Sequence, residues 1–260
     1  MDLMADDATG SVKSADRALS ILEHLASTSE PQSLGDIAKS LDIPKSSLHG
    51  LLRTMQNRGW VQPDGSGLRY WIGPHALTVG ASYLARDRFV ASTTQILDEL
   101  SLQLGETVHL GSLDGPDIVY LAKRDARHSL RLVSGIGVRL PAYATALGKV
   151  LLSELPPSAV GNHLLLPLKR LTPHTIVDVD AFAADLEAAR SRGYAIDEQE
   201  STEGVRCFAV ALGSTGPRTH AISCSVPLAR LDSEFQAHVV SSLRQAADSF
   251  EDVDANLVSI

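Results

Sequence analysis

The chain has 260 residues, of which 44% are hydrophobic and 21% are charged, a composition typical of a globular protein with room for two domains. No apolar run approaches the roughly 18 residues of a membrane span, and the acidic residues 1–11, unlike a signal peptide, are expected to form a disordered tail. Two cysteines exclude a disulfide framework and favour the cytoplasm, while the net charge of −8 excludes a protein that is basic over its whole surface.

The N-terminal part predicts a helix over residues 14–27, followed by a helix-turn-helix. Ser33 is placed to cap the first helix of that motif, with Asp36 as its partner in a capping box. Pro44 suits the start of the second helix, because the missing N–H of proline costs nothing there. The outer face of this second helix is polar and carries no acid, and its expected DNA contacts are Lys45, Ser46, Ser47, His49 and Arg53.

The next stretch predicts a β-hairpin, because two β-prone runs within residues 60–72 flank a Pro-Asp-Gly-Ser-Gly turn. Together these elements predict a winged-helix domain over residues 12–73, with Arg69 as the cation nearest to the tip of the wing. Residues 12–72 carry seven Lys or Arg against six Asp or Glu, a net charge of only +1. DNA binding would therefore depend on where the charges lie rather than on their number.

A linker helix is predicted over residues 74–86, after the break at Gly73 and Pro74. Its apolar stripe is larger than a solvent-exposed connecting helix needs. We therefore expect the stripe to be buried against a second copy or the neighbouring domain. The stripe consists of Leu77, Val79, Ala81 and Leu84.

Residues 87–252 predict an α+β domain, and residues 253–260 predict a tail. Helices are expected at 88–104, 144–153, 158–165, 179–192 and 235–250. Strands are expected at 107–113, 118–123, 129–133, 194–197, 206–212 and 219–226. The strands would form a mostly antiparallel sheet with helices packed on it, a common shape for a small-molecule sensor.

Some polar residues of this domain are candidates for a ligand site. Ser223 and Ser225 share one strand face, and with the N–H groups that start the 144–153 helix they could hold a carboxylate. The alternative is a polar strand face open to solvent. Asp197 either accepts a hydrogen bond from a ligand or caps a turn. Cys207 is a buried small residue, a pocket residue, or a nucleophile that needs a base from a distant segment.

Five segments occur in a characteristic order along the chain. They are Arg-Ala-Leu-Ser-Ile-Leu at 17–22, the helix-turn-helix at 34–49, Leu-Pro-Ala-Tyr-Ala-Thr-Ala-Leu-Gly-Lys at 140–149, the stretch 192–210, and Ile-Ser-Cys-Ser-Val-Pro at 222–227. Over roughly residues 12–250 the chain thereby resembles the IclR family of bacterial transcription regulators. Gly50 is a departure, since the family often has a long side chain there.

The resemblance implies a winged helix, a linker helix and a GAF-like effector-binding domain, arranged as a homodimer or a dimer of dimers. It implies a double-stranded DNA operator and a small-molecule effector, often a carboxylate, as partners, with no cofactor. The implied effector contacts are Ala146, Leu147, Asp197, Cys207, Ser223 and Ser225, under an apolar lid around Leu130 and Val133.

The leading hypothesis is a ligand-responsive DNA-binding regulator rather than an enzyme. The alternative is a Cys207-dependent hydrolase or acyltransferase with the winged helix as an adaptor, for which His109 or His220 could supply the base. A third hypothesis is a protein-interaction module, since winged helices also bind proteins, and a loss of salt dependence would favour it. For the polar face of the second helix, the alternative to DNA contact is an ordinary solvated face. No Cys, His or acid spacing indicates a metal site.

Overall fold

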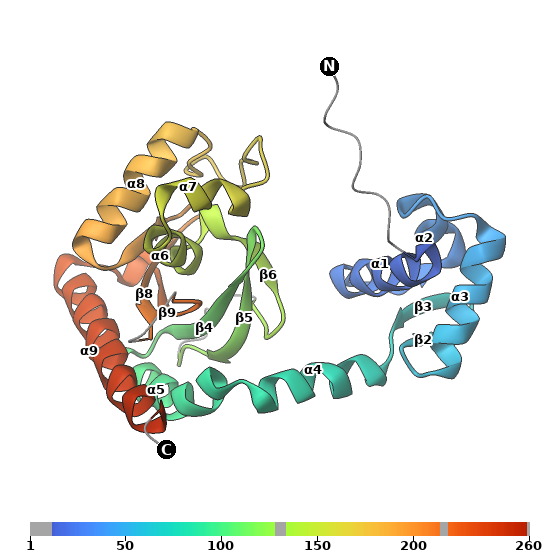
Figure 1. Cartoon of the computed structure of the whole chain (residues 1–260), viewed down its shortest axis with the longest axis horizontal. Helices are drawn as coiled ribbons and strands as arrows, with labels where there is room; N and C mark the ends of the chain where they lie inside the picture. The colour runs from blue at the N-terminus through green and yellow to red at the C-terminus, as the bar shows by residue number, and fades with distance from the viewer. Residues whose placement is uncertain (1–11, 128–133, 214–217, 259–260) are drawn as a thin grey trace. The chain divides into compact units, whose positions relative to one another are not determined.

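The computed structural model describes residues 12–127, 134–213 and 218–258, and the chain divides into two units between Arg86 and Asp87 (Figure 1). The elements of the N-terminal unit are α1 (Lys13–Ser27), β1 (Gln32–Ser33), α2 (Leu34–Ser40), α3 (Lys45–Asn57), β2 (Val61–Pro63), β3 (Arg69–Ile72) and α4 (Pro74–Arg86). Helices α2 and α3 form the helix-turn-helix, and β2 and β3 form the hairpin that follows it.

The start of α2 is fixed by a reciprocal pair of hydrogen bonds. The Ser33 hydroxyl accepts from the backbone N–H of Asp36, and the Asp36 carboxylate accepts from the backbone N–H of Ser33. The predicted capping box is therefore confirmed. The apolar faces of the helices meet in a core together with β2. Its most deeply buried side chains, each at most 1% exposed, are Ile21, Ile37, Leu48, Leu52 and Val61.

The wing is an antiparallel hairpin in which β2 pairs with β3. The Asp64 carboxylate shapes its turn by accepting hydrogen bonds from the backbone N–H groups of Ser66 and Arg69. A third strand, β1, pairs with the other edge of β3, so the strand order is β1-β3-β2. The winged helix is confirmed, but β1 was not predicted because two residues are too few to show strand alternation.

Helix α4 lacks a buried side chain, although its sequence carries an apolar stripe. Leu77 is 75% exposed and Val79 is 46% exposed. The expectation that a second copy or the neighbouring domain covers this stripe stays a prediction.

The C-terminal unit is an antiparallel sheet with helices on both faces. Its elements are α5 (Arg88–Leu104), β4 (Thr107–Asp114), β5 (Asp117–Arg124), β6 (Arg139–Pro141), η1 (Ala142–Ala144), α6 (Ala146–Glu154), α7 (Pro157–Val160), η2 (Gly161–His163), α8 (Val179–Arg192), β7 (Ala195–Glu198), β8 (Val205–Leu212), β9 (His220–Pro227), η3 (Leu228–Arg230) and α9 (Ser233–Val258). The strand order is β6-β5-β4-β9-β8-β7, and every neighbouring pair is antiparallel. The predicted α+β fold is confirmed.

The sheet of this unit has a helical layer on each face (Figure 1). Helices α5 and α9 cover one face of the sheet, where Cys224 is fully buried as expected for a core residue. Helices α6 and α8 cover the other face, which presents the small side chains of Ala209, Ala211 and Ala221. These alanines let α6 lie close to the strands, which matters for the site described below.

Three segments differ from the sequence-based expectation, and one cannot be compared. The single helix expected at 158–165 is replaced by the short helices α7 and η2, which end at His163, because Gly161 interrupts the helix. Strand β6 forms at 139–141, where no strand was expected, because this edge segment pairs with β5. Helix α9 continues to Val258, whereas a helix ending at 250 and a tail from 253 were expected; residues 251–258 contain neither Gly nor Pro to stop it. The expected strand at 129–133 lies outside the described residues. Within those residues we find no helix that is long and apolar enough to cross a membrane.

Candidate functional site

The first candidate site is the outward face of α3. Leu48, Leu52 and Met55 point into the core of the N-terminal unit, which leaves the opposite side of the helix to solvent. The five residues predicted for this face are all exposed: Lys45, Ser46, Ser47, His49 and Arg53. Because the N-cap Pro44 offers no side-chain bond, the first N–H groups of α3 also stay available to an anion.

Arg69, the sixth residue predicted to meet DNA, lies on β3 and is exposed. Its Nη1 donates to the backbone oxygen of Pro31 at 3.1 Å, which ties the guanidinium to the segment before α2. An arginine has five N–H donors, so the remaining ones can still reach a phosphate.

The second candidate site is a cavity of about 10 Å³ between α6 and the sheet. The residues that line it are Tyr120, Thr145, Ala146, Leu147, Asp197, Ser201, Cys207, Ser223 and Ser225. All six effector contacts implied by the resemblance within the described residues are thus brought together, from four separate elements. Leu130 and Val133, the expected lid, lie outside the described residues.

Tyr120, Thr145 and Ser201 also line this cavity and were missed by the sequence analysis. Thr145 had a recognisable signal, since a threonine directly before an apolar helix is a typical N-cap. Its hydroxyl accepts from the backbone N–H of Gly148 at 3.1 Å. Tyr120 gave no such signal, because its place on the cavity face depends on a register shift between β4 and β5 that no local pattern encodes.

The start of α6 is positioned by two close approaches. A Cβ on Gly148 would lie 2.1 Å from the carbonyl oxygen of Ala142, and one on Gly111 would lie 2.9 Å from Cδ1 of Leu147. Only glycine fits at Gly148, so the first turn of α6 packs directly against η1. The N–H groups of Ala146 and Leu147 have no partner within the helix, and they lie at the positive end of its dipole.

Asp197 both lines the cavity and organises the turn that follows β7. Its Oδ1 accepts from the backbone N–H of Glu200 at 2.6 Å, and its Oδ2 accepts from the hydroxyl of Ser201. The side chain is 1% exposed. Burial raises its pKa to about 6, against the opposing effect of the bonds from Ser201 and Glu200. Both roles that the sequence left open, turn cap and cavity residue, are therefore compatible with its position.

Cys207 has the environment of an unreactive thiol. Its Sγ donates to the Ser225 hydroxyl at 3.2 Å, and burial, reinforced by the charge of Asp197, raises the thiol pKa well above its usual range. The two candidate bases have other partners: His109 Nε2 lies 2.9 Å from the Ser134 hydroxyl, and His220 Nε2 lies 3.5 Å from Asp87. A nucleophilic cysteine needs the opposite environment, with a base in reach and a lowered pKa.

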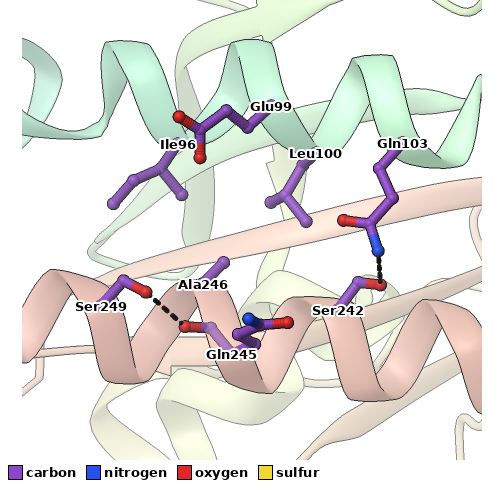
Figure 2. Close-up of a pocket in the computed structure, with 8 residues that line it drawn as sticks. All are labelled: Ile96, Glu99, Leu100, Gln103, Ser242, Gln245, Ala246 and Ser249. Atoms are coloured by element: carbon purple, nitrogen blue, oxygen red, sulfur yellow. Dashed lines mark hydrogen bonds between the residues drawn. The ribbon is translucent and has the colours of Figure 1, made fainter.

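A second cavity, of about 120 Å³, lies between α5 and α9 on the other face of the sheet (Figure 2). Leu100 and Ala246 point toward one another across it, and the Gln103 amide donates to the Ser242 hydroxyl at 3.0 Å. Glu99 is its one ionisable lining residue, and it is exposed. This cavity shares no residue with the predicted site and has no buried charge, so it is a groove between packed helices.

Comparison with known proteins assigns both units. Residues 14–65 match the IclR helix-turn-helix domain, and residues 81–251 match the bacterial transcriptional regulator IclR C-terminal domain. The chain belongs to the IclR family. It is therefore a transcriptional regulator with a helix-turn-helix DNA-binding domain and an effector-binding C-terminal domain.

Full-length relatives support the same assignment. The transcriptional repressor IclR of Escherichia coli K12 is 34% identical over 249 residues, which are 92% of this chain and 90% of that protein. A transcriptional regulator from Rhodococcus sp. RHA1 has a structure with a TM-score of 0.80 and 30% identity, covering 95% of this chain and all of that one. An IclR homologue from Microbacterium hydrocarbonoxydans, solved with 4-hydroxybenzoate, shares the fold at a TM-score of 0.78 and 22% identity, covering 92% and 98% of the chains.

The environment of Cys207 predicts a low reactivity toward alkylating reagents. In the folded protein at pH 8, we expect iodoacetamide to modify Cys207 more than about tenfold more slowly than in the denatured chain, because its raised pKa leaves little reactive thiolate and the side chain is half-buried. Peptide mass spectrometry separates Cys207 from Cys224, and the denatured chain is the control. Equal rates in the two states would restore the hydrolase or acyltransferase hypothesis.

Proposed function

We propose that this protein controls transcription by binding a double-stranded operator through α3 and the wing, with an affinity set by a small carboxylate effector bound between α6 and the sheet. The observation that carries the proposal is the convergence of Ala146, Leu147, Asp197, Cys207, Ser223 and Ser225 on one buried cavity. Because its target is bacterial DNA, the protein would act in the cytoplasm, and without a reaction of its own.

The cavity has the donors that a carboxylate requires. Ala146 and Leu147 at the start of α6 line one small space together with Ser223 and Ser225, and the helix dipole favours a negative charge there. Asp197 would repel an anion when it is ionised, so the preferred effector also carries a group that can donate a hydrogen bond. The Microbacterium homologue was solved with such a molecule, a carboxylate that bears a hydroxyl.

The DNA contacts would come from a small number of cations placed on α3 and the wing. Lys45 and Arg53 supply charge on the outer face of α3, and Arg69 supplies it on β3. In this arrangement the wing follows the phosphate backbone while α3 lies in the major groove.

The working unit would be at least a dimer, either a homodimer or a dimer of dimers, on a pseudo-palindromic operator. One winged helix offers too few cations for tight binding by a protein with a net charge of −8. The exposed apolar residues Leu77 and Val79 on α4 provide a surface that a second copy can bury. Effector binding would then change the spacing of the two α3 helices, for which a coupling of about 1–3 kcal/mol suffices.

Substitutions on α3 test the DNA interface. Lys45→Ala and Arg53→Ala should each weaken operator binding without changing the melting temperature, because both side chains point away from the core. If the lost contact is to phosphate, the slope of log K against log salt should decrease by about 0.9; if it is to a base, discrimination at one position should fall by about 1–3 kcal/mol. Lys169→Ala, an equal charge change on the exposed surface of the other unit, is the control. An unchanged affinity and slope would mean that the substituted residue is only solvated.

Substitutions in the cavity test the effector site. The double variant Ser223→Ala with Ser225→Ala should abolish the response to carboxylate effectors and leave operator binding without effector intact, because both hydroxyls line the cavity. The measurement is operator affinity by fluorescence anisotropy, with and without a panel of small acids. The matched control is Ser242→Ala with Ser249→Ala in the α5–α9 groove. Equal effector potency in the cavity variant and the wild type would contradict the proposal.

Sedimentation tests the assembly. We expect the wild type to sediment as a dimer or larger at micromolar concentration and to protect two half-sites separated by a multiple of the DNA helical turn. Leu77→Lys with Val79→Lys should shift the protein toward monomers, because it places charge on the surface to be buried. Gly80→Ala, on the same helix and with open space around its Cβ, is the control. A wild-type monomer that protects one asymmetric half-site would exclude the dimer, and with it control through the spacing of the two α3 helices.

A further inference from the structure

We propose that His109 determines the specificity of the effector cavity by hydrogen-bonding, through Nδ1, to a hydroxyl group on the effector. This inference rests on the proposed effector site and narrows its ligand class to hydroxy acids. Nothing in the sequence singles out His109 for this role, since it lies in an ordinary strand pattern on β4.

The position of His109 joins it to the cavity on two sides. It is the direct cross-strand partner of Ser223 on β9, so the two side chains stand on the same face of the sheet. Its imidazole also stacks on the ring of Tyr120, with centroids 4.4 Å apart and an interplanar angle of 17°. Ser223 and Tyr120 both line the cavity. The imidazole therefore lies next to two residues that line the cavity, while His109 itself is not among the lining residues.

The Nδ1 atom of His109 is a buried polar atom without a partner. The residue is 1% exposed, and its Nε2 lies 2.9 Å from the Ser134 hydroxyl. Within the described part of the chain, no group hydrogen-bonds to Nδ1. Buried polar atoms of this kind are rare in folded proteins, because each loses its bonds to water and gains nothing in exchange. A ligand hydroxyl would supply the missing bond.

The charge state of the imidazole selects the ligand group. Burial, and secondarily the charge of Lys123, lowers the pKa of His109 to about 3, so the ring is neutral at physiological pH. In a neutral imidazole one nitrogen donates and the other accepts, and the Ser134 hydroxyl can serve either tautomer. A hydroxyl is the group that can pair with Nδ1 in both cases. An ammonium group pairs only with the accepting form, and a carboxylate only with the donating form.

The two halves of the site then define a ligand with a carboxylate at one end and a hydroxyl at the other. The carboxylate lies against the start of α6 and the hydroxyls of Ser223 and Ser225, and the hydroxyl lies against His109. Directly paired residues have Cβ atoms about 4.5–5.5 Å apart, so one small molecule that contacts Ser223 is within reach of His109. Sites built around a hydrogen bond to a hydroxyl discriminate strongly against analogues that lack it.

The test uses matched pairs of probes on the full-length protein. The pairs are lactate with propionate, and 4-hydroxybenzoate with benzoate, and the dissociation constants come from isothermal titration calorimetry. We expect the wild type to bind the hydroxy acid of at least one pair about tenfold or more tightly than its partner. In His109→Phe, which keeps the ring stack, that ratio should fall to about twofold or less, with the affinity for the deoxy acid unchanged. His238→Phe, the same change at an exposed site on α9, should leave the ratio as in the wild type.

A second measurement needs no substitution. In the wild type labelled with nitrogen-15 histidine, the Nδ1 resonance of His109 should shift on addition of the hydroxy acid and not on addition of the deoxy acid. Equal binding of both members of every pair, or an unchanged ratio in His109→Phe, overturns the role of His109. In that case, deoxy-acid binding that is lost in Ser223→Ala with Ser225→Ala leaves the proposed effector site intact. An absence of binding by all four acids overturns the hydroxy-acid inference, and the response of operator affinity to the wider acid panel then decides the effector site separately.

Discussion

The close approach of α6 to the sheet is the constraint on which the effector-binding unit depends. Gly148 leaves no room for a Cβ against Ala142, and Gly111 leaves little room beside Leu147. Alanines on β8 and β9 have small side chains, so they let the helix approach the sheet closely. Because the residues at these contacts are small, the first turn of α6 packs close to Ser223 and Ser225 on β9. A larger residue at Gly148 would lift the turn and separate the two sets of donors.

A buried lysine on α6 also fixes the helix in position, through ion pairs with α8 and with the turn after β7. Lys149 is 1% exposed, and its ammonium lies 2.8 Å from the Asp185 carboxylate and in contact with that of Glu200. Glu200 in turn donates its backbone N–H to Asp197 in the cavity wall. Ion pairs at such depth add little net stability, but removing one partner leaves an uncompensated charge. Lys149 therefore helps to position Asp197 through Glu200, which contacts both residues.

Local sequence signals predicted those parts of the fold that local chemistry determines. The capping box at Ser33 and the turn at Asp64 are contained within a few residues each, so their patterns are visible in the chain. The convergence of Ala146, Asp197 and Ser223 was reached through alternation on the strands and through the family resemblance. Tyr120 and the His109 nitrogen that has no partner among the described residues were not predicted, because both depend on the pairing of β4 with other strands. The strands β1 and β6 are short edge additions that carry no pattern of their own.

The two sites differ in how their polar groups relate to water, and this difference fits their roles. In the proposed DNA interface, the cations of α3 would stay solvated until DNA displaces the water and counterions around them, so their contribution would depend on salt. The polar groups of the cavity are already removed from water, so a ligand gains most where it completes bonds that the protein leaves unmade. Because residues 12–72 carry a net charge of only +1, a change in charge could alter the operator affinity only slightly. In the proposed dimer, an effector would therefore act by moving the two DNA-binding surfaces relative to their half-sites, which requires a ligand site rigid enough to transmit strain. The glycine contacts of α6 and its buried ion pairs supply that rigidity.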